Sequence, residues 1–143
     1  MFTLLNDVQV SKNFKLSEFE CNDGSHEIML DMRLVEAIQK LRTLIGVPIH
    51  IQSAYRTPAH NRAIGGSPNS RHLKGEAADI KVTSMTPKTV ALAAEKCGFT
   101  GIGVYRFNGK RFNHLDVRET KSYWMDVKGT KNLQPVKTLQ EIK

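Results

Sequence analysis

The stretch Ser-Arg-His-Leu-Lys-Gly-Glu-Ala-Ala-Asp-Ile, residues 70–80, carries a histidine and an aspartate seven positions apart. His72 lies in a polar segment, and residues 77–82, Ala-Ala-Asp-Ile-Lys-Val, have the composition of a strand. A loop that turns at Gly75 can bring His72 back over the beginning of this strand, beside Asp79. An imidazole nitrogen and a carboxylate oxygen are two of the three protein ligands that a catalytic zinc ion takes. This stretch therefore predicts part of a metal site.

The segments around this stretch predict one α+β domain over residues 1–143. Residues 119–143 mix polar and apolar positions and are expected to wrap the domain and end in a tail. We expect a small, mainly antiparallel sheet flanked by helices, two of them longer. The expected elements are an extended lead-in (1–15), a helix (27–45), a strand (48–55), a short helix (59–64), a strand (77–82), a helix (86–97), and a hairpin of strands 101–105 and 111–117 that turns at Asn108-Gly109.

His114 is the best candidate for a third ligand. In Phe-Asn-His-Leu-Asp-Val, residues 112–117, His114 and Asp116 point to one face of the strand and the apolar residues beside them to the other. If this strand lies beside the one that carries Asp79, the two histidines His72 and His114 converge on Asp79, with Asp116 close by. The spacing alone leaves two interpretations at equal weight: a zinc site, or a loop histidine and a capping aspartate.

Two further residues would act beside such a metal. Asp116 is either a general base for the attacking water or a partner that orients a ligand histidine, and the sequence does not separate these roles. Arg56 follows a predicted strand at the mouth of a loop, where a guanidinium can hold a substrate carboxylate or an oxyanion. Taken alone, an arginine at such a position is more often part of a surface ion pair.

The composition limits the classes of partner. With 21 Lys and Arg residues against 14 Asp and Glu, the net charge is +7, which favours an anionic partner such as nucleic acid, a membrane surface or a cell wall. No apolar run reaches the roughly 18 residues of a membrane span, so no membrane insertion is expected. The N-terminus lacks the features of a signal peptide. The two cysteines, Cys21 and Cys97, are too few for a disulfide scaffold and are expected to be reduced.

Three segments carry a resemblance to a known family: Ser-Ala-Tyr-Arg-Thr-Pro-Ala-His-Asn (53–61), Ser-Arg-His-Leu-Lys-Gly-Glu-Ala-Ala-Asp (70–79) and His-Leu-Asp (114–116). They resemble the zinc D-Ala-D-Ala carboxypeptidases, a family with VanY-type and VanX-type peptidases, murein endopeptidases and phage endolysins, whose fold is shared by the hedgehog signalling domain. The resemblance covers about residues 14–118, and its element Ser-x-His-x-x-Gly-x-Ala-x-Asp is specific.

The resemblance implies a role for five residues. It implies that His72 and Asp79 are the first two zinc ligands and that His114 is the third. It also implies that Arg56 helps to stabilise the transition state and that Ser70 contributes to substrate binding.

The sequence departs in one respect from the pattern of many relatives, which carry a catalytic Glu, Asp or His two or three residues before the last ligand. Here Phe112 and Arg111 occupy those positions, and neither is a plausible base. The chain is similar instead to a subgroup with His-x-Asp, in which Asp116 is the candidate base.

These observations together predict a zinc-dependent peptidase that hydrolyses stem or cross-bridge peptide bonds of peptidoglycan, as a D,D-carboxypeptidase or an endopeptidase. A phage or prophage endolysin, or an enzyme of wall remodelling, fits this description. The alternative is a non-catalytic zinc-containing module that binds the wall or another partner. A nucleic-acid-binding domain ranks last because it leaves the His/Asp set unexplained, and no nucleic-acid partner is expected. We expect a monomer that is made in the cytoplasm and reaches the wall after phage lysis or by another export route.

Overall fold

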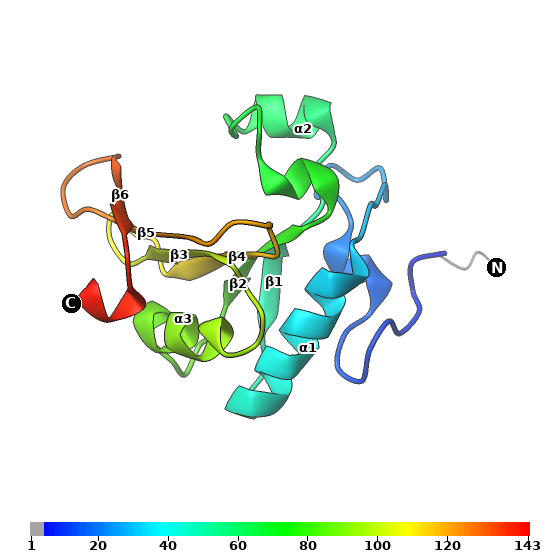
Figure 1. The fold of residues 1–143 in the computed structure, drawn as a ribbon. Helices are drawn as coiled ribbons and strands as arrows, with labels where there is room; N and C mark the ends of the chain where they lie inside the picture. Colours follow the sequence, from blue (N-terminus) through cyan, green and yellow to red (C-terminus); the bar gives the residue numbers. More distant parts are fainter. Residues whose placement is uncertain (1–4) are drawn as a thin grey trace.

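A computed structural model describes residues 5–143, which form one sheet of six strands with helices on both faces (Figure 1). The strand order is β1-β2-β4-β3-β5-β6, in which β3 and β5 are parallel and the other neighbours antiparallel. The predicted α+β class with a mainly antiparallel sheet is confirmed. In chain order the elements, with η for a 3₁₀ helix, are η1 (Leu16–Phe19), α1 (Met32–Ile45), β1 (His50–Ser53), α2 (Pro58–Ala63), η2 (Arg71–Lys74), β2 (Ala77–Lys81), α3 (Pro87–Glu95), β3 (Gly101–Tyr105), β4 (Phe112–Asp116), β5 (Ser122–Asp126), β6 (Leu133–Val136) and η3 (Leu139–Glu141).

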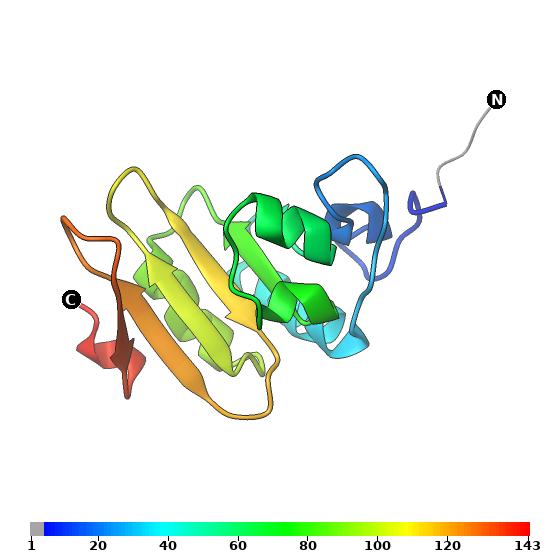
Figure 2. The ribbon, with the colours of Figure 1, turned by 90° about the horizontal axis from the view of Figure 1, so that it is seen from above.

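The helices cover the two faces of the sheet unequally. The longer helices α1 and α3 pack on one face and form the core with the inward side chains of the strands (Figure 1). On the other face, α2 and η2 lie towards β2, and β3, β4 and β5 are left uncovered, as the view from above shows (Figure 2). Fully buried core side chains come from both helices and three strands: Leu34, Ile38, Leu41, Val90, Ala94, Ile80, Ile102 and Leu115.

Helix α1 begins five residues later than the sequence pattern predicts. The Asp31 carboxylate accepts a hydrogen bond from the backbone N–H of Arg33 at 2.9 Å, which is the standard N-cap interaction, so the helix begins at Met32. It ends as predicted at Gly46, which adopts a left-handed conformation with φ of 70°. The first-turn prolines of α2 and α3 follow capping threonines, as their sequences predict.

The segment predicted to be an extended lead-in is mostly turns. Residues 1–4 lie outside the described part of the chain, and residues 5–15 form turns and bends with one isolated bridge between Gln9 and Lys15. Both cysteines are free and buried. No helix within residues 5–143 is long and apolar enough to cross a membrane.

The C-terminal segment contributes more structure than a wrap or a tail. Residues 122–126 and 133–136 form β5 and β6, which extend the sheet beyond β3. Leu139 and Ile142 are fully buried in the core. Strand β6 shows only a weak hydrophobic alternation in the sequence because it is an exposed edge strand. It also contains Pro135, a residue that sheets accept mainly at their edges.

Gly75 forms the turn from η2 into β2 and lies close to the backbone of Met29. Its φ is +69°, and a Cβ atom there would lie 2.2 Å from the backbone oxygen of Met29. The Gly75 carbonyl also accepts a hydrogen bond from the Asp31 N–H at 3.0 Å, so the segment before α1 packs directly on this turn. Only glycine satisfies both the backbone conformation and the close approach.

We expect Gly75→Ala to destabilise the protein more than Gly46→Ala. Both residues have a positive φ, so both variants lose about 1–2 kcal/mol from the left-handed conformation. Gly46 has open space around it, whereas the contact with Met29 adds overpacking that typically costs about 1–3 kcal/mol at Gly75. Urea unfolding of the zinc-free proteins measures the difference. Equal midpoints for the two variants would contradict the close approach.

Candidate metal centre

The register of the sheet places Asp79 of β2 and His114 and Asp116 of β4 on the face opposite α1 and α3. Asp79 on β2 is the direct partner of His114 on β4 in an antiparallel pair, and residues opposite each other point to the same face. His114 is in turn opposite Gly103 of β3. Leu115 points the other way and is fully buried in the core. The adjacency of these two strands, on which the predicted site depended, is therefore present.

His72 reaches the same place from η2. Its side chain is buried, and its Nδ1 lies 2.6 Å from the carbonyl oxygen of Ala54. Because a carbonyl oxygen only accepts hydrogen bonds, Nδ1 carries a proton, and Nε2 faces Asp79 Oδ1 at 3.3 Å. Ser70 begins this turn by accepting a hydrogen bond from the His72 N–H at 3.2 Å. The turn thus positions His72, and the Ala54 carbonyl places a proton on its Nδ1.

Asp79 lies between the two histidines and Arg56. Its Oδ1 is 3.1 Å from His114 Nδ1, and its Oδ2 accepts from Arg56 Nη2 at 3.2 Å. Burial alone would raise the pKa of Asp79, but hydrogen bonds with His114 and His72 outweigh it and hold that pKa well below its usual range. The carboxylate is therefore ionised at neutral pH.

Arg56 is held by partners that the sequence did not reveal. Its Nε donates to Ser53 Oγ at 3.2 Å and its Nη1 to Asn61 Oδ1 at 3.3 Å. With the Asp79 contact, three of the five guanidinium N–H groups are used, and the remaining two are left to donate to a ligand. The guanidinium is largely buried, with 13% of the side chain exposed, so it is not an ordinary surface ion pair.

Asp116 lies on the far side of the His114 ring from Asp79. Its Oδ2 is 2.7 Å from His114 Nε2, while Nδ1 of the same ring faces Asp79. Asp116 is fully buried and accepts two hydrogen bonds from the Arg118 side chain, at 2.8 and 2.6 Å. This is the arrangement in which a carboxylate orients a metal-binding histidine. Of the two roles considered for Asp116, the geometry favours this one over a general base.

The electrostatics of this cluster favour positive charge on or beside the His114 ring. Burial opposes a charge on His114, yet hydrogen bonds with Asp116 and Asp79 raise its pKa to about 9. Burial would raise the pKa of Asp116, but Arg118 and His114 lower it well below its usual value. Two ionised carboxylates thus flank one imidazole, and a positive charge at its Asp79 side is stabilised.

The donor set fits zinc. His72, Asp79 and His114 each offer one ligand atom, and these atoms lie within 4.8 Å of one another. Each ligand is oriented by a partner on its outer side: the Ala54 carbonyl, Arg56 and Asp116 respectively. Two imidazoles and one carboxylate, with such partners, are typical of catalytic zinc sites that keep a position open for water.

A hollow of about 350 Å³ opens over the three ligands. Arg56 and Ser70, both singled out from the sequence, line it, and so does Tyr105 on β3. Tyr105 was not among the site residues predicted from the sequence. The sequence pattern that could have indicated Tyr105 is the alternation along the strand. Tyr105 shares a face with Gly101 and Gly103, small residues that leave room for side chains on the uncovered face.

The fold and the site define an α+β domain with a candidate zinc centre. A model of the family peptidase M15 matches residues 12–116, so the chain belongs to this family. A zinc D-Ala-D-Ala carboxypeptidase from Streptomyces albus G is 38% identical to the chain over 66 residues, a match that covers 46% of this chain and 26% of that protein. The chain thus spans well under two thirds of that relative. The zinc in the name of that relative agrees with the donor set of His72, Asp79 and His114.

We expect His72→Ala and Asp79→Ala to lose bound zinc, because each removes one of three ligands. His50→Ala is the matched control, since His50 is exposed on β1 and lies outside the cluster. Zinc content per chain, measured by mass spectrometry after dialysis against a weak chelator, should be near one for the parent and the control and near zero for the two ligand variants. Full zinc content in Asp79→Ala would contradict the assigned ligand set.

Proposed function

We propose that the chain hydrolyses peptide bonds in the stem or cross-bridge peptides of peptidoglycan, as a zinc-dependent carboxypeptidase or endopeptidase. The observation that carries this proposal is a set of three oriented candidate zinc ligands beside Arg56, which lines the hollow above them and uses three of its five N–H groups within the described residues. The Streptomyces relative is named for D-Ala-D-Ala substrates. The net charge of +7 supports attraction to an anionic wall.

In this proposal His72, Asp79 and His114 hold the zinc ion, and Arg56 binds the substrate. Zinc, when bound at such a site, lowers the pKa of water towards roughly 7 and polarises a carbonyl group. The two uncommitted N–H groups of Arg56 donate to a substrate carboxylate or to the oxyanion that develops during hydrolysis. Because Ser53 and Asn61 hold the guanidinium, little reorganisation is needed when charge develops.

Asp116 acts on the reaction through His114 and not on the substrate. It holds the imidazole by Nε2 and stabilises the orientation in which Nδ1 faces the metal position. Ser70 has two roles in the proposal: it begins the turn that carries His72, and it contributes a hydroxyl to the wall of the hollow.

The biological setting that we propose is action on the wall as an endolysin or a remodelling enzyme, after release or export from the cytoplasm. All three ligands come from one chain, which supports a protein that works as a monomer.

Digestion of purified peptidoglycan with and without chelator tests the proposed activity. Chelator-sensitive release of free D-alanine identifies a carboxypeptidase, and new internal amino termini identify an endopeptidase; mass spectrometry of the fragments separates them. If zinc-loaded protein cleaves no wall from several bacteria, the activity proposed here is wrong, and a zinc-containing wall-binding module becomes the better description.

Asp116→Asn separates the two roles of this carboxylate. If Asp116 orients His114, zinc affinity falls about 10–100-fold, and hydrolysis is largely restored when zinc is saturating. Zinc affinity is measured by chelator competition and turnover by the peptide assay at several zinc concentrations. A loss of turnover of about 100-fold or more at saturating zinc, with affinity unchanged, would instead identify Asp116 as the general base.

A further inference from the structure

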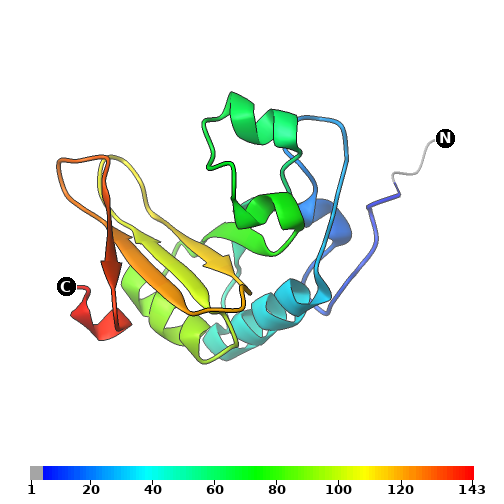
Figure 3. The ribbon, with the colours of Figure 1, turned by 45° about the horizontal axis from the view of Figure 1, so that its top comes forward.

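A second hollow, of about 560 Å³, adjoins the metal centre on the uncovered face of the sheet. It shares Tyr105 and Lys110 with the hollow over the zinc ligands. Its walls are the turn between β3 and β4 (106–111) and the loop between β5 and β6 (127–132), which lie side by side at one end of the sheet (Figure 3). A ligand that extends from the metal centre across Tyr105 therefore enters this second hollow.

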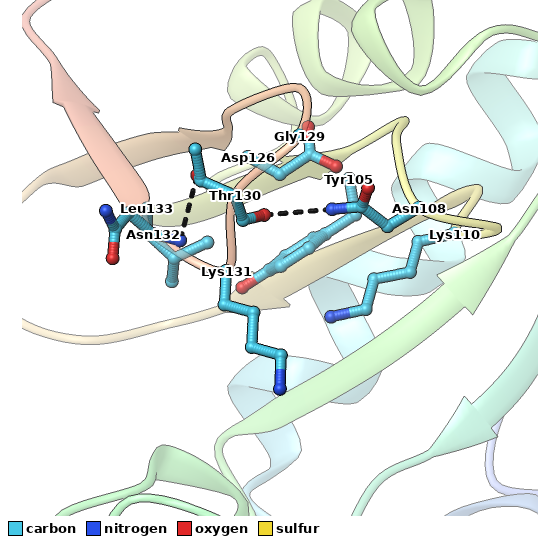
Figure 4. A pocket seen from close by; sticks show the side chains of 9 residues that line it. All are labelled: Tyr105, Asn108, Lys110, Asp126, Gly129, Thr130, Lys131, Asn132 and Leu133. Carbon is cyan, nitrogen blue, oxygen red and sulfur yellow. Dashed lines mark hydrogen bonds between the residues drawn. The ribbon is translucent and has the colours of Figure 1, made fainter.

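The two walls are held together by hydrogen bonds. Asn108 Nδ2 donates to the carbonyl oxygen of Thr130 at 2.9 Å and joins the turn to the loop (Figure 4). Below them, the buried carboxylate of Asp126 accepts the backbone N–H groups of Arg106 and Phe107, each at 2.7 Å. The second hollow is thus largely formed before any ligand arrives, as is usual for binding sites.

The groups that line this hollow favour a negatively charged ligand. Lys110 and Lys131 extend to the same side of the Tyr105 ring, one from each wall (Figure 4). Neither lysine has a carboxylate partner among the ion pairs of residues 5–143. The one carboxylate in the lining belongs to Asp126; its Oδ2 accepts the two backbone hydrogen bonds of the turn, and its Oδ1 lies 3.9 Å from Arg106 Nε.

Tyr105 adds a neutral donor between the two hollows. Its hydroxyl oxygen accepts a hydrogen bond from Trp124 Nε1 at 2.9 Å, which leaves its own proton to donate to a ligand. The ring is fixed by stacking on Phe112, with 4.3 Å between centroids. A hydroxyl donor beside two ammonium groups is suited to a carboxylate.

We propose that this second hollow binds a carboxylate of the peptide substrate at a distance from the scissile bond. The inference rests on the proposed function, because stem peptides of peptidoglycan carry carboxylates in addition to the one at the C-terminus. Lys110 and Lys131 are the residues that recognise this group, and Tyr105 places it relative to the metal centre. Arg56 remains the group that acts at the scissile bond, so the two hollows bind different parts of one peptide.

The test compares Lys110→Gln, Lys131→Gln and the double variant on two stem peptides, one with its side-branch carboxylates free and one with them amidated. We expect KM for the free-carboxylate peptide to rise about two- to fivefold for each single variant and further for the double variant, because partly exposed charge pairs are individually weak. KM for the amidated peptide and kcat for both should change little. Lys128→Gln is the control, since Lys128 is exposed in the same loop and does not line the hollow.

Binding of the same two peptides to zinc-loaded protein, measured by calorimetry, gives a second readout. Where the wall digest has identified the bond that is cut, that bond is N-methylated so that the peptide stays intact during the measurement. A loss of affinity in the double variant for the free-carboxylate peptide alone supports the site, even if no wall is cleaved. Equal losses for both peptides, or a loss in Lys128→Gln of the same size, would overturn it and indicate attraction by general charge. No difference between any of the proteins would also overturn it, whether or not the proposed hydrolysis is observed.

Discussion

The pairing of β2 with β4 is the constraint on which the metal centre depends. Asp79 and His114 are direct partners in this pair, and both point away from α1 and α3. A shift of the register by one residue would exchange the faces of every side chain, so Leu115 would leave the core and His114 would enter it. The apolar residues that bury one face therefore also fix the position of the ligands on the other. Stability and zinc binding share one determinant in this sheet.

The second constraint is that β3 must leave space for the buried carboxylate of Asp116 on β4. Asp116 is fully buried and bonded to both His114 and Arg118, and a Cβ atom on Gly101 would lie 2.0 Å from its Oδ1. Next to it, a Cβ atom on Gly103 would lie 2.5 Å from Trp124 Nε1. These two glycines of β3 leave the room in which larger side chains orient His114 and Tyr105. A buried carboxylate is costly unless it is fully paired, and here every partner is supplied by the chain.

The sequence predicted the parts of this arrangement that depend on local pattern. The α+β class, most helices, the β3–β4 hairpin and the convergence of His72 with Asp79 follow from periodicity and turn residues. The partners that orient the ligands did not follow, because they depend on contacts between distant segments. The Ala54 carbonyl carries no signal in its side chain, and the pairing of β3 with β5 joins strands that are not consecutive. Strand β6 was missed because its edge position leaves most of its side chains exposed.

The two hollows differ in how much of their lining lies inside the segment that the family model matches. The matched segment ends at residue 116, so it contains the zinc ligands and Arg56 but neither β5 nor the β5–β6 loop. Yet β5 supplies Trp124, which bonds Tyr105, and Asp126, which bonds the turn that carries Lys110. The candidate metal centre and Arg56 thus lie within the matched segment, whereas the proposed recognition of the carboxylate also depends on residues beyond it. Because β5 pairs with β3 and not with β2 or β4, a change in the β5–β6 loop alters the second hollow and leaves in place the strand pair that carries Asp79 and His114.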